Sequence, residues 1–292
     1  MKKIAQVIHP HGGHWVGDGF PVRTLFSYDG DAQALSPFLL FDYAGPHVFA
    51  PAMSPRGVGQ HPHRGFETVT IVYDGEVSHR DSTGAGGTIG PGDVQWMTAA
   101  GGIIHEEFHS PAFTKTGGPF RVVQLWVNLP VKHKMTKPGY QSITNADIPV
   151  VDLANDAGRA RIIAGDFVGT KGAARSFSPV NVWDLRVNRD KDIALDLPQG
   201  HTAMIAVLSG HATFNNQEGN GEGAGEATIL RFEREGSKVS IHADSDAMLL
   251  VLTGEPLGEP VYGHGPFVMT NQTEIRQAID DFNNGRFGQV AS

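Results

Sequence analysis

The chain has 292 residues and no cysteine, which excludes disulfide bonds, thiolate metal ligands and cysteine nucleophiles. Its net charge of −8 comes without a run of lysine or arginine, which disfavours direct nucleic-acid binding. The first residues contain no apolar signal segment, and the longest strongly apolar run, Ala247–Leu252, is too short to span a bilayer. We therefore expect a cytoplasmic globular protein that does not contact membranes, with a monomer as the default state.

Short β-strands dominate the first half of the chain. The 37 glycines and 18 prolines favour turns and short strands over long helices. Asp74-Gly75, between two apolar stretches, predicts a two-residue hairpin. Many short strands in succession indicate a β-sandwich or barrel. Seven stretches, most of them rich in β-branched and aromatic residues and bounded by turn residues, are the expected strands: 22–28, 36–44, 67–75, 76–82, 93–100, 102–109 and 121–130.

A charged stretch then interrupts the pattern and suggests a domain boundary. Val131–Asn145 contains three lysines and a Pro-Gly pair, and a solvated linker explains it better than a docking patch does. We accordingly divide the chain into an N-terminal domain, residues 1–135, and a C-terminal domain, residues 136–292.

The second half repeats the first in outline. Residues 201–215 resemble residues 66–80, each being an apolar strand, a turn glycine and a second strand. When Gly210 is aligned with Gly75, Asp196 and Pro198 fall where His61 and His63 stand. The second half therefore reads as a duplicated barrel without metal ligands.

Two local features complete the second half. The glycine-rich stretch Gly219–Gly225 lacks the lysine and hydroxyl of a phosphate-binding loop, so it predicts a flexible hairpin tip. Near the end, Thr273–Asn283 has apolar residues at helical spacing and Gly285 as a stop, which predicts a short C-terminal helix.

Two pairs of alternating residues in the first half have the composition of a metal site. His61 and His63 form an H-x-H pair, and His105 and Glu107 form an H-x-E pair. Because side chains on a strand alternate between faces, both members of each pair project to the same side. Three imidazoles and one carboxylate with open positions suit an O₂-activating or Lewis-acid metal. The same groups buried without a cation would be costly to desolvate.

A second carboxylate competes for the fourth ligand position. Glu67 has the same parity as His61 and His63, as Glu107 has relative to His105. Strand parity alone leaves both glutamates open as the fourth ligand.

Five stretches of this sequence resemble the pirin family, which belongs to the cupin superfamily. They are VGDGFPVRTLF (16–26), HPHRGFETVTIVYDGEVSHRDSTG (61–84), GPGDVQWMTAAGGIIHEE (90–107), QLWVNLP (124–130) and HGPFVMTNQTEIRQAIDDFNNGRFG (264–288). The resemblance runs nearly end to end. It implies an all-β fold of two cupin barrels in tandem, followed by a short C-terminal helix.

The resemblance also implies the roles of the site residues. The iron ligands would be the residues that match the family's H-x-H and H-x-E positions, namely His61, His63, His105 and Glu107. Glu67 would then lie next to the ligands, where it could orient an imidazole or handle a proton. Fe²⁺ is the expected cofactor, although other divalent first-row metals accept the same donors.

By the same resemblance, the expected activity is that of a quercetin 2,3-dioxygenase, with a flavonol and O₂ as substrates. Glu107 or Glu67 would deprotonate the 3-hydroxyl, after which O₂ opens the ring with loss of carbon monoxide. The alternative is a redox-sensing regulatory protein that binds a transcription factor or a metabolic enzyme, with the oxidation state of the iron as its switch.

Overall fold

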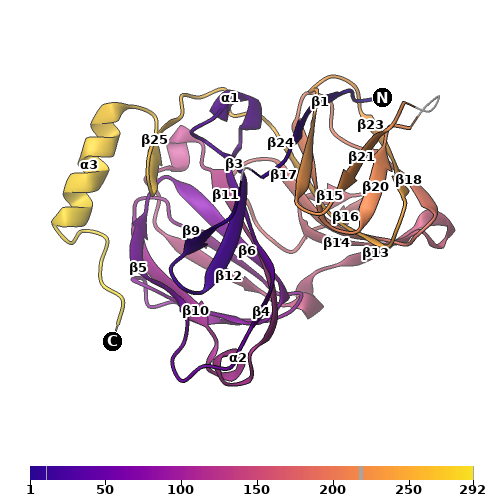
Figure 1. Cartoon of the computed structure of the whole chain (residues 1–292). Helices are drawn as coiled ribbons and strands as arrows, with labels where there is room; N and C mark the ends of the chain where they lie inside the picture. The colour runs from indigo at the N-terminus through magenta and orange to yellow at the C-terminus, as the bar shows by residue number, and fades with distance from the viewer. Residues whose placement is uncertain (11, 217–219, 292) are drawn as a thin grey trace. The chain divides into compact units, whose positions relative to one another are not determined.

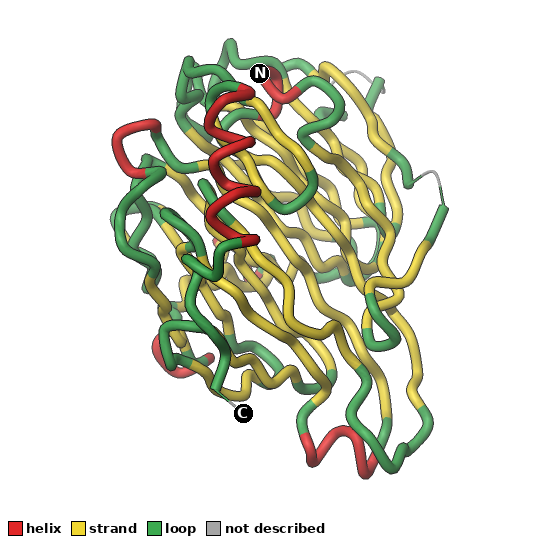
Figure 2. Tube along the Cα trace, turned by 90° about the vertical axis from the view of Figure 1, so that its left-hand side faces the viewer, coloured by secondary structure: helices red, strands yellow, loops and turns green. Residues whose placement is uncertain are grey.

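The structure is a computed structural model that describes residues 1–10, 12–216 and 220–291. Strands make up most of the trace (Figure 2). The chain forms two compact units, one of Met1–Pro10 with Ala146–Pro256 and the other of His11–Asn145 with Leu257–Ser292. None of the described helices is long and apolar enough to cross a bilayer.

The unit that contains the histidine motifs is a barrel of two antiparallel sheets. The larger sheet has the order β12-β9-β6-β11-β4-β3-β2, and the smaller one has the order β5-β10-β7-β8. Side chains from both inner faces form an apolar core at one end of the barrel, which includes Phe20, Val72, Val77 and Phe120. The strands are β2 (His14–Val16), β3 (Phe20–Ser27), β4 (Phe38–Phe49), β5 (Gly57–His63), β6 (Phe66–Asp74), β7 (Val77–Asp81), β8 (Gly86–Ile89), β9 (Val94–Thr98), β10 (Ile103–His109), β11 (Gly118–Asn128) and β12 (Gly139–Ile143).

The other unit is a barrel of the same design. Its sheets have the orders β1-β22-β19-β24-β17-β14-β13 and β18-β23-β20-β21, which match the first barrel position for position. The elements are β1 (Ile4–Ile8), β13 (Val150–Leu153), β14 (Gly158–Ala164), β15 (Asp166–Phe167), β16 (Thr170–Lys171), β17 (Val180–Val187), β18 (Lys191–Asp196), β19 (Thr202–Ser209), β20 (His211–Phe214), β21 (Glu222–Gly225), β22 (Thr228–Phe232), β23 (Lys238–Ala243) and β24 (Ala247–Gly254).

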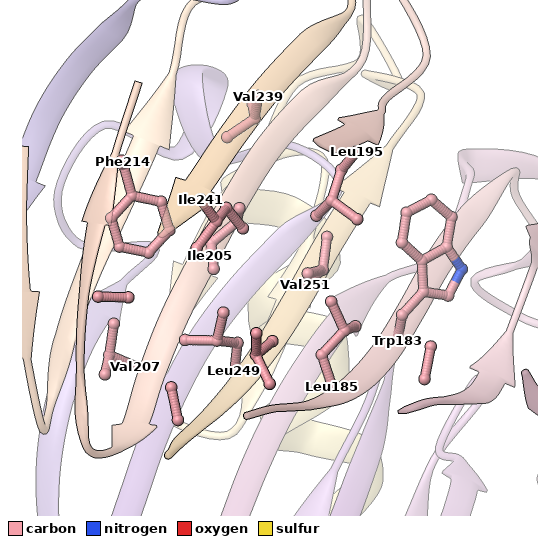
Figure 3. Close-up of a cluster of buried hydrophobic side chains, with 14 of the residues drawn as sticks. Trp183, Leu185, Leu195, Ile205, Val207, Phe214, Val239, Ile241, Leu249 and Val251 are labelled. Atoms are coloured by element: carbon pink, nitrogen blue, oxygen red, sulfur yellow. The ribbon is translucent and has the colours of Figure 1, made fainter. Parts of the chain in front are cut away.

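The interior of this second barrel is filled with apolar side chains. Leu185, Leu195, Ile205, Ile241 and Leu249 converge from both sheets (Figure 3). Within the part of the chain that the structure describes, this barrel contains no group of three metal-ligating side chains. The predicted duplication is confirmed, and aliphatic residues occupy the space in which the first barrel holds its histidines.

Glycines carry the chain between the two sheets of each barrel. Gly75, with φ +87°, joins β6 of the large sheet to β7 of the small one, and Gly210, with φ +78°, joins β19 to β20 in the same way. The hairpin predicted at Asp74-Gly75 is therefore wrong, because β6 and β7 do not pair. The predicted tip at Gly219–Gly225 is also shorter than expected: Glu222–Gly225 is strand β21, and Gly219 lies outside the described residues.

The division of the chain differs from the predicted domains, 1–135 and 136–292. The N-terminal strand β1 pairs with β22, so the first residues belong to the C-terminal barrel. A third of the predicted linker forms β12, an edge strand that pairs with β9. The boundary between the two units therefore lies at the end of the predicted linker, after Asn145. The last 36 residues belong with the N-terminal barrel, because their contacts are made there.

The C-terminal segment holds the predicted helix. Helix α3 (Gln272–Asn283) starts one residue before the predicted range, and the Asn271 side chain caps it by accepting from the Glu274 N–H. Its buried face, with Ile275 and Ala278, packs on Phe267 and Met269 of β26. The helix lies beside β25 (Figure 1). The remaining elements are β25 (Tyr262–His264), β26 (Phe267–Met269), α1 (Ala32–Leu35), α2 (Pro111–Thr116), and the 3₁₀ turns Val131–His133, Asn145–Asp147 and Ala154–Asp156.

Candidate metal centre

Two paired strands bring three histidines together inside the N-terminal barrel. In the antiparallel pairing of β5 and β10, His105 lies directly opposite His61. The possible ligand atoms of His61, His63 and His105 all lie within 4.8 Å of one another. The ring centroids of His61 and His105 are 4.2 Å apart, and each of these rings is 4.9 Å from His63. These three imidazoles are therefore close enough together to hold one metal ion.

The hydrogen bonds of these rings leave one lone pair free on each. His61 donates from Nδ1 to the Gly59 carbonyl at 2.8 Å, so its Nε2 is the free acceptor. Nδ1 of His63 and Nε2 of His105 are buried and have no hydrogen-bond partner among the described residues. Leaving a buried polar atom unsatisfied costs about 1–3 kcal/mol. A cation bound between the three rings would satisfy all three nitrogen lone pairs. The residues therefore fit a divalent metal.

The electrostatic environment keeps two of these rings neutral. Burial lowers the pKa of His63 well below its usual value, with a further lowering from His61 and an opposing effect of the Pro266 carbonyl. Burial likewise lowers the pKa of His105, and the neighbouring histidines add to the effect. Neutral imidazole is the form that binds a metal, so little proton release opposes binding at neutral pH.

Glu107, the fourth predicted ligand, stands slightly apart from the three histidines. It groups instead with His105 and His79, so the predicted set forms two overlapping groups that share His105. The carboxylate accepts from the Thr70 hydroxyl at 3.3 Å and from the Gln124 amide at 3.2 Å. Both bonds are long and come from neutral donors, so lone pairs remain available. Glu107 also lines the same cavity as His61 and His63.

His79 and Asp81 support His105 from behind. His79 donates from Nε2 to the Asp81 carboxylate at 3.1 Å, which leaves its Nδ1 as an acceptor 3.3 Å from Nδ1 of His105. Burial would raise the pKa of Asp81, but hydrogen bonds from His79 and Thr83 hold it below its usual value. The ionised carboxylate thereby fixes the His79 tautomer, which in turn directs the free lone pair of His105 toward the cluster.

His79 and Asp81 were not among the residues predicted for the site. They form an H-x-D pair on β7 with the same alternation as the two predicted pairs. Only the register, in which His105 faces Asp81 and Glu107 faces His79, connects them to the centre. The H-x-D alternation could have been recognised in the sequence, but the pairing of β7 with β10 could not.

Glu67 lies away from the cluster. It sits on β6 opposite Thr98, whose hydroxyl donates to it at 2.7 Å. Thr70 of the same strand faces the barrel interior, where its hydroxyl contacts Glu107. Because residues 67 and 70 lie on opposite faces of a strand, Glu67 points to the other face of the sheet. Strand parity does not hold from His63 to Glu67, because the chain changes sheets at Gly65, with φ +93°, between His63 and β6. Burial raises the pKa of Glu67 to about 7.

The C-terminal segment braces the turn that follows His63. Arg64 forms a buried ion pair with Asp281 of α3 at 2.8 Å, and its guanidinium lies 4.6 Å from the centre of the Phe287 ring. Lys134 donates to the carbonyls of Gly65 and Val268 at 2.7 and 2.8 Å. A turn held by the buried side chains of Arg64 and Lys134 fixes the direction in which His63 enters the site.

An apolar cavity of about 320 Å³ opens onto the cluster. Its walls come from β2, β3, β4, β5, β10 and β11, and seven of the twelve lining residues are apolar. Burial raises the pKa of one of them, Asp42, although the Thr24 hydroxyl and the charge of His14 act against this. The lining residues are Val16, Phe20, Val22, Asp42, Ala44, Val58, His61, His63, Glu107, Val122, Gln124 and Trp126. A mostly apolar cavity with polar groups at its base is typical of a small-molecule site.

Comparisons with known proteins agree with this arrangement. Residues 19–127 match the Pirin family model, and residues 182–288 match the model described as the Pirin C-terminal cupin domain. A Pseudomonas aeruginosa protein named "Putative quercetin 2,3-dioxygenase" is 56% identical over 98% of this chain and 99% of its own length.

Solved structures show the same fold. The crystal structure of a quercetin 2,3-dioxygenase from Acinetobacter baumannii is 52% identical and matches with a TM-score of 0.95 over 100% of both chains. A bacterial pirin from Escherichia coli, solved in complex with nickel(II), is 21% identical and shares the fold with a TM-score of 0.66, over 86% of this chain and 99% of that one. The chain therefore belongs to the pirin family and is built of two cupin barrels.

Proposed function

We propose that this protein is a metal-dependent dioxygenase of the quercetin 2,3-dioxygenase type, with Fe²⁺ as its cofactor and a flavonol and O₂ as its substrates. The observation that carries the proposal is the cluster of three imidazoles with free lone pairs, two of which line an apolar cavity. The names of the relatives support the same reaction class.

His61, His63, His105 and Glu107 would hold the metal. When bound, it would supply Lewis-acid chemistry and the capacity to react with O₂. The apolar walls would hold the flat rings of the substrate and exclude water from the reacting atoms. A carboxylate oxygen of Glu107 would accept the proton of the substrate hydroxyl, since Glu107 lines the cavity whereas Glu67 faces the other side of β6.

Thr70 and Gln124 would keep the Glu107 carboxylate in place during this transfer. Each donates one hydrogen bond to a different carboxylate oxygen, from the opposite sheet of the barrel. The carboxylate is thus held between the cluster and the cavity, with its accepting lone pairs available to a ligand. A base positioned in this way contributes typically about 10²–10⁴-fold to a rate.

The test is a matched pair of histidine variants. Protein reconstituted with Fe²⁺ without oxygen and then exposed to air should consume quercetin and release carbon monoxide. His61→Ala should lose both the stoichiometric metal and the turnover, whereas His264→Ala, at an exposed position, should lose neither. Turnover by metal-free protein would contradict the proposal. A metal-loaded protein that consumes no flavonol would contradict it too, and would favour the redox-sensing alternative.

A further inference from the structure

A row of polar side chains crosses the inner face of the large sheet of the N-terminal barrel. Directly paired positions on β3, β4, β11, β6 and β9 supply it, whereas the next row along the same strands is apolar. The polar row is Thr24, Asp42, Gln124, Thr70 and Gln95, and the apolar row begins Val22, Ala44, Val122 and Val72. Polar groups on an inner face are costly unless they are hydrogen-bonded, so each member of the row needs a partner.

Part of the row serves the metal centre. Thr70 and the Gln124 amide donate to Glu107, and the Gln95 amide, 3.2 Å from Nδ1 of His79, shares that acceptor with His105. The carbonyl oxygen of the Gln124 side chain is buried and has no partner in the described part of the chain. Its orientation is determined by its neighbour, because the flipped amide would place this oxygen against the Glu107 carboxylate.

Asp42 lies opposite Gln124 across the β4–β11 pairing, and both line the cavity. The Thr24 hydroxyl donates to one oxygen of the Asp42 carboxylate. The Gln124 carbonyl is buried, so the polar group that this wall offers to a ligand is an acceptor, the Asp42 carboxylate. Acceptors bind hydroxyl or amine donors and reject ethers and carbonyls.

We propose that Asp42 forms a hydroxyl-binding subsite that selects polyhydroxylated aromatic ligands. One ligand oxygen lies at the histidine cluster, and a second hydroxyl donates to the Asp42 carboxylate. Phe20, Val122 and Trp126 supply apolar walls for the ring between them. A cavity of about 320 Å³ is near the lower end of the sizes usual for drug-like ligands, which suits a flat molecule of a few rings. The inference rests on the proposed function, because it takes an aromatic substrate to bind at the cluster.

The experiment compares two ligands that share the coordinating unit. Quercetin and 3-hydroxyflavone both carry the 3-hydroxy-4-keto group, but 3-hydroxyflavone lacks every other hydroxyl. Their dissociation constants are measured without oxygen on Fe²⁺-loaded protein, by quenching of tryptophan fluorescence, since Trp126 lines the cavity. The variants are the wild type, Asp42→Asn and the control Asp196→Asn, which makes the same chemical change at an exposed position of the other barrel. Gln124 is left intact because it holds Glu107.

The wild type should prefer quercetin by at least roughly tenfold, about the contribution of one hydrogen bond to a charged group. Asp42→Asn should lower this preference at least fivefold, while Asp196→Asn leaves it unchanged. Removing the Asp42 charge also changes its repulsion of an ionised 3-hydroxyl. Both ligands carry this group, so that effect cancels in the ratio of their dissociation constants. An equal preference in the wild type and Asp42→Asn, or no preference in the wild type, would overturn the subsite. Selective binding without turnover in air would support the subsite while contradicting the dioxygenase proposal.

Discussion

Replacing His79 with leucine should weaken metal binding without altering any of the four candidate ligands. His79 accepts the Nδ1–H of His105 at 3.3 Å and is itself held by Asp81 at 3.1 Å. Without this acceptor, the metal-free protein can still shift the His105 proton to the other nitrogen. The metal-bound form cannot do so, because Nε2 is then committed to the metal. The unpaired N–H therefore penalises the bound state selectively.

The size of the effect follows from that buried N–H. An unpaired buried donor costs about 1–3 kcal/mol, which corresponds to roughly 5- to 150-fold in a dissociation constant. Loss of the partner of a metal-bound histidine typically costs about 10–100-fold in affinity. We therefore expect His79→Leu to raise the dissociation constant for the metal by about 10- to 100-fold. His79→Gln, whose side-chain carbonyl can accept the same hydrogen bond, should recover part of this loss.

Competition with a chromophoric chelator measures these constants, with Fe²⁺ in the absence of oxygen and with Ni²⁺ in air. Ser78→Ala is the matched control, because Ser78 lies on the same strand and its hydroxyl bonds to Thr88 rather than to the centre. Its affinity should stay within about twofold of the wild type. Wild-type affinity in His79→Leu would refute the role of His79. An equal loss in Ser78→Ala would show that the effect comes from general damage to β7.

Three further predictions concern stability. Because burial raises the folded-state pKa of Glu67 from 4.5 to about 7, its contribution to stability is complete below pH 4.5 and is lost as the pH rises through 7. Glu67→Gln should thus gain about 3 kcal/mol relative to the wild type between pH 4.5 and pH 8.5 in urea unfolding; an equal difference at both pH values would contradict this. Asp281→Ala leaves Arg64 buried without its partner and should cost about 3–5 kcal/mol, whereas the exposed neighbour Asp280→Ala should cost less than about 0.5 kcal/mol. Equal losses in these two variants would rule out the buried pair as the cause. Metal at about 100 times its dissociation constant should add about 2.7 kcal/mol to the wild type and nothing to His61→Ala, and the same gain in both would place the metal elsewhere.

Local alternation predicted the centre of the site. The H-x-H and H-x-E pairs are read from the sequence because a strand places alternate residues on one face, and β5 and β10 do so for His61, His63 and His105. The same rule failed for Glu67, since it holds only within one strand and the chain changes sheets at Gly65.

Features that depend on pairing across the chain were not predictable in this way. His79 and Asp81 become relevant only through the register of β7 against β10. The two barrels also take their outer strands from opposite sides of the chain: β12 completes one, and β1 from the N-terminus takes the equivalent place in the other. Composition places the domain boundary at residue 135, but it does not show which sheet an edge strand joins. The positions of β1 and β12 were therefore not predictable from composition.

The central claim is that one cation binds where the three histidines of the N-terminal barrel meet. The most direct test is a crystal structure of the protein loaded with Fe²⁺ without oxygen, with anomalous scattering recorded at the iron edge. We predict one iron per chain, in contact with His61, His63, His105 and Glu107. Iron at another position, or well-ordered crystals of iron-treated protein with no anomalous peak beside these residues, would contradict the account.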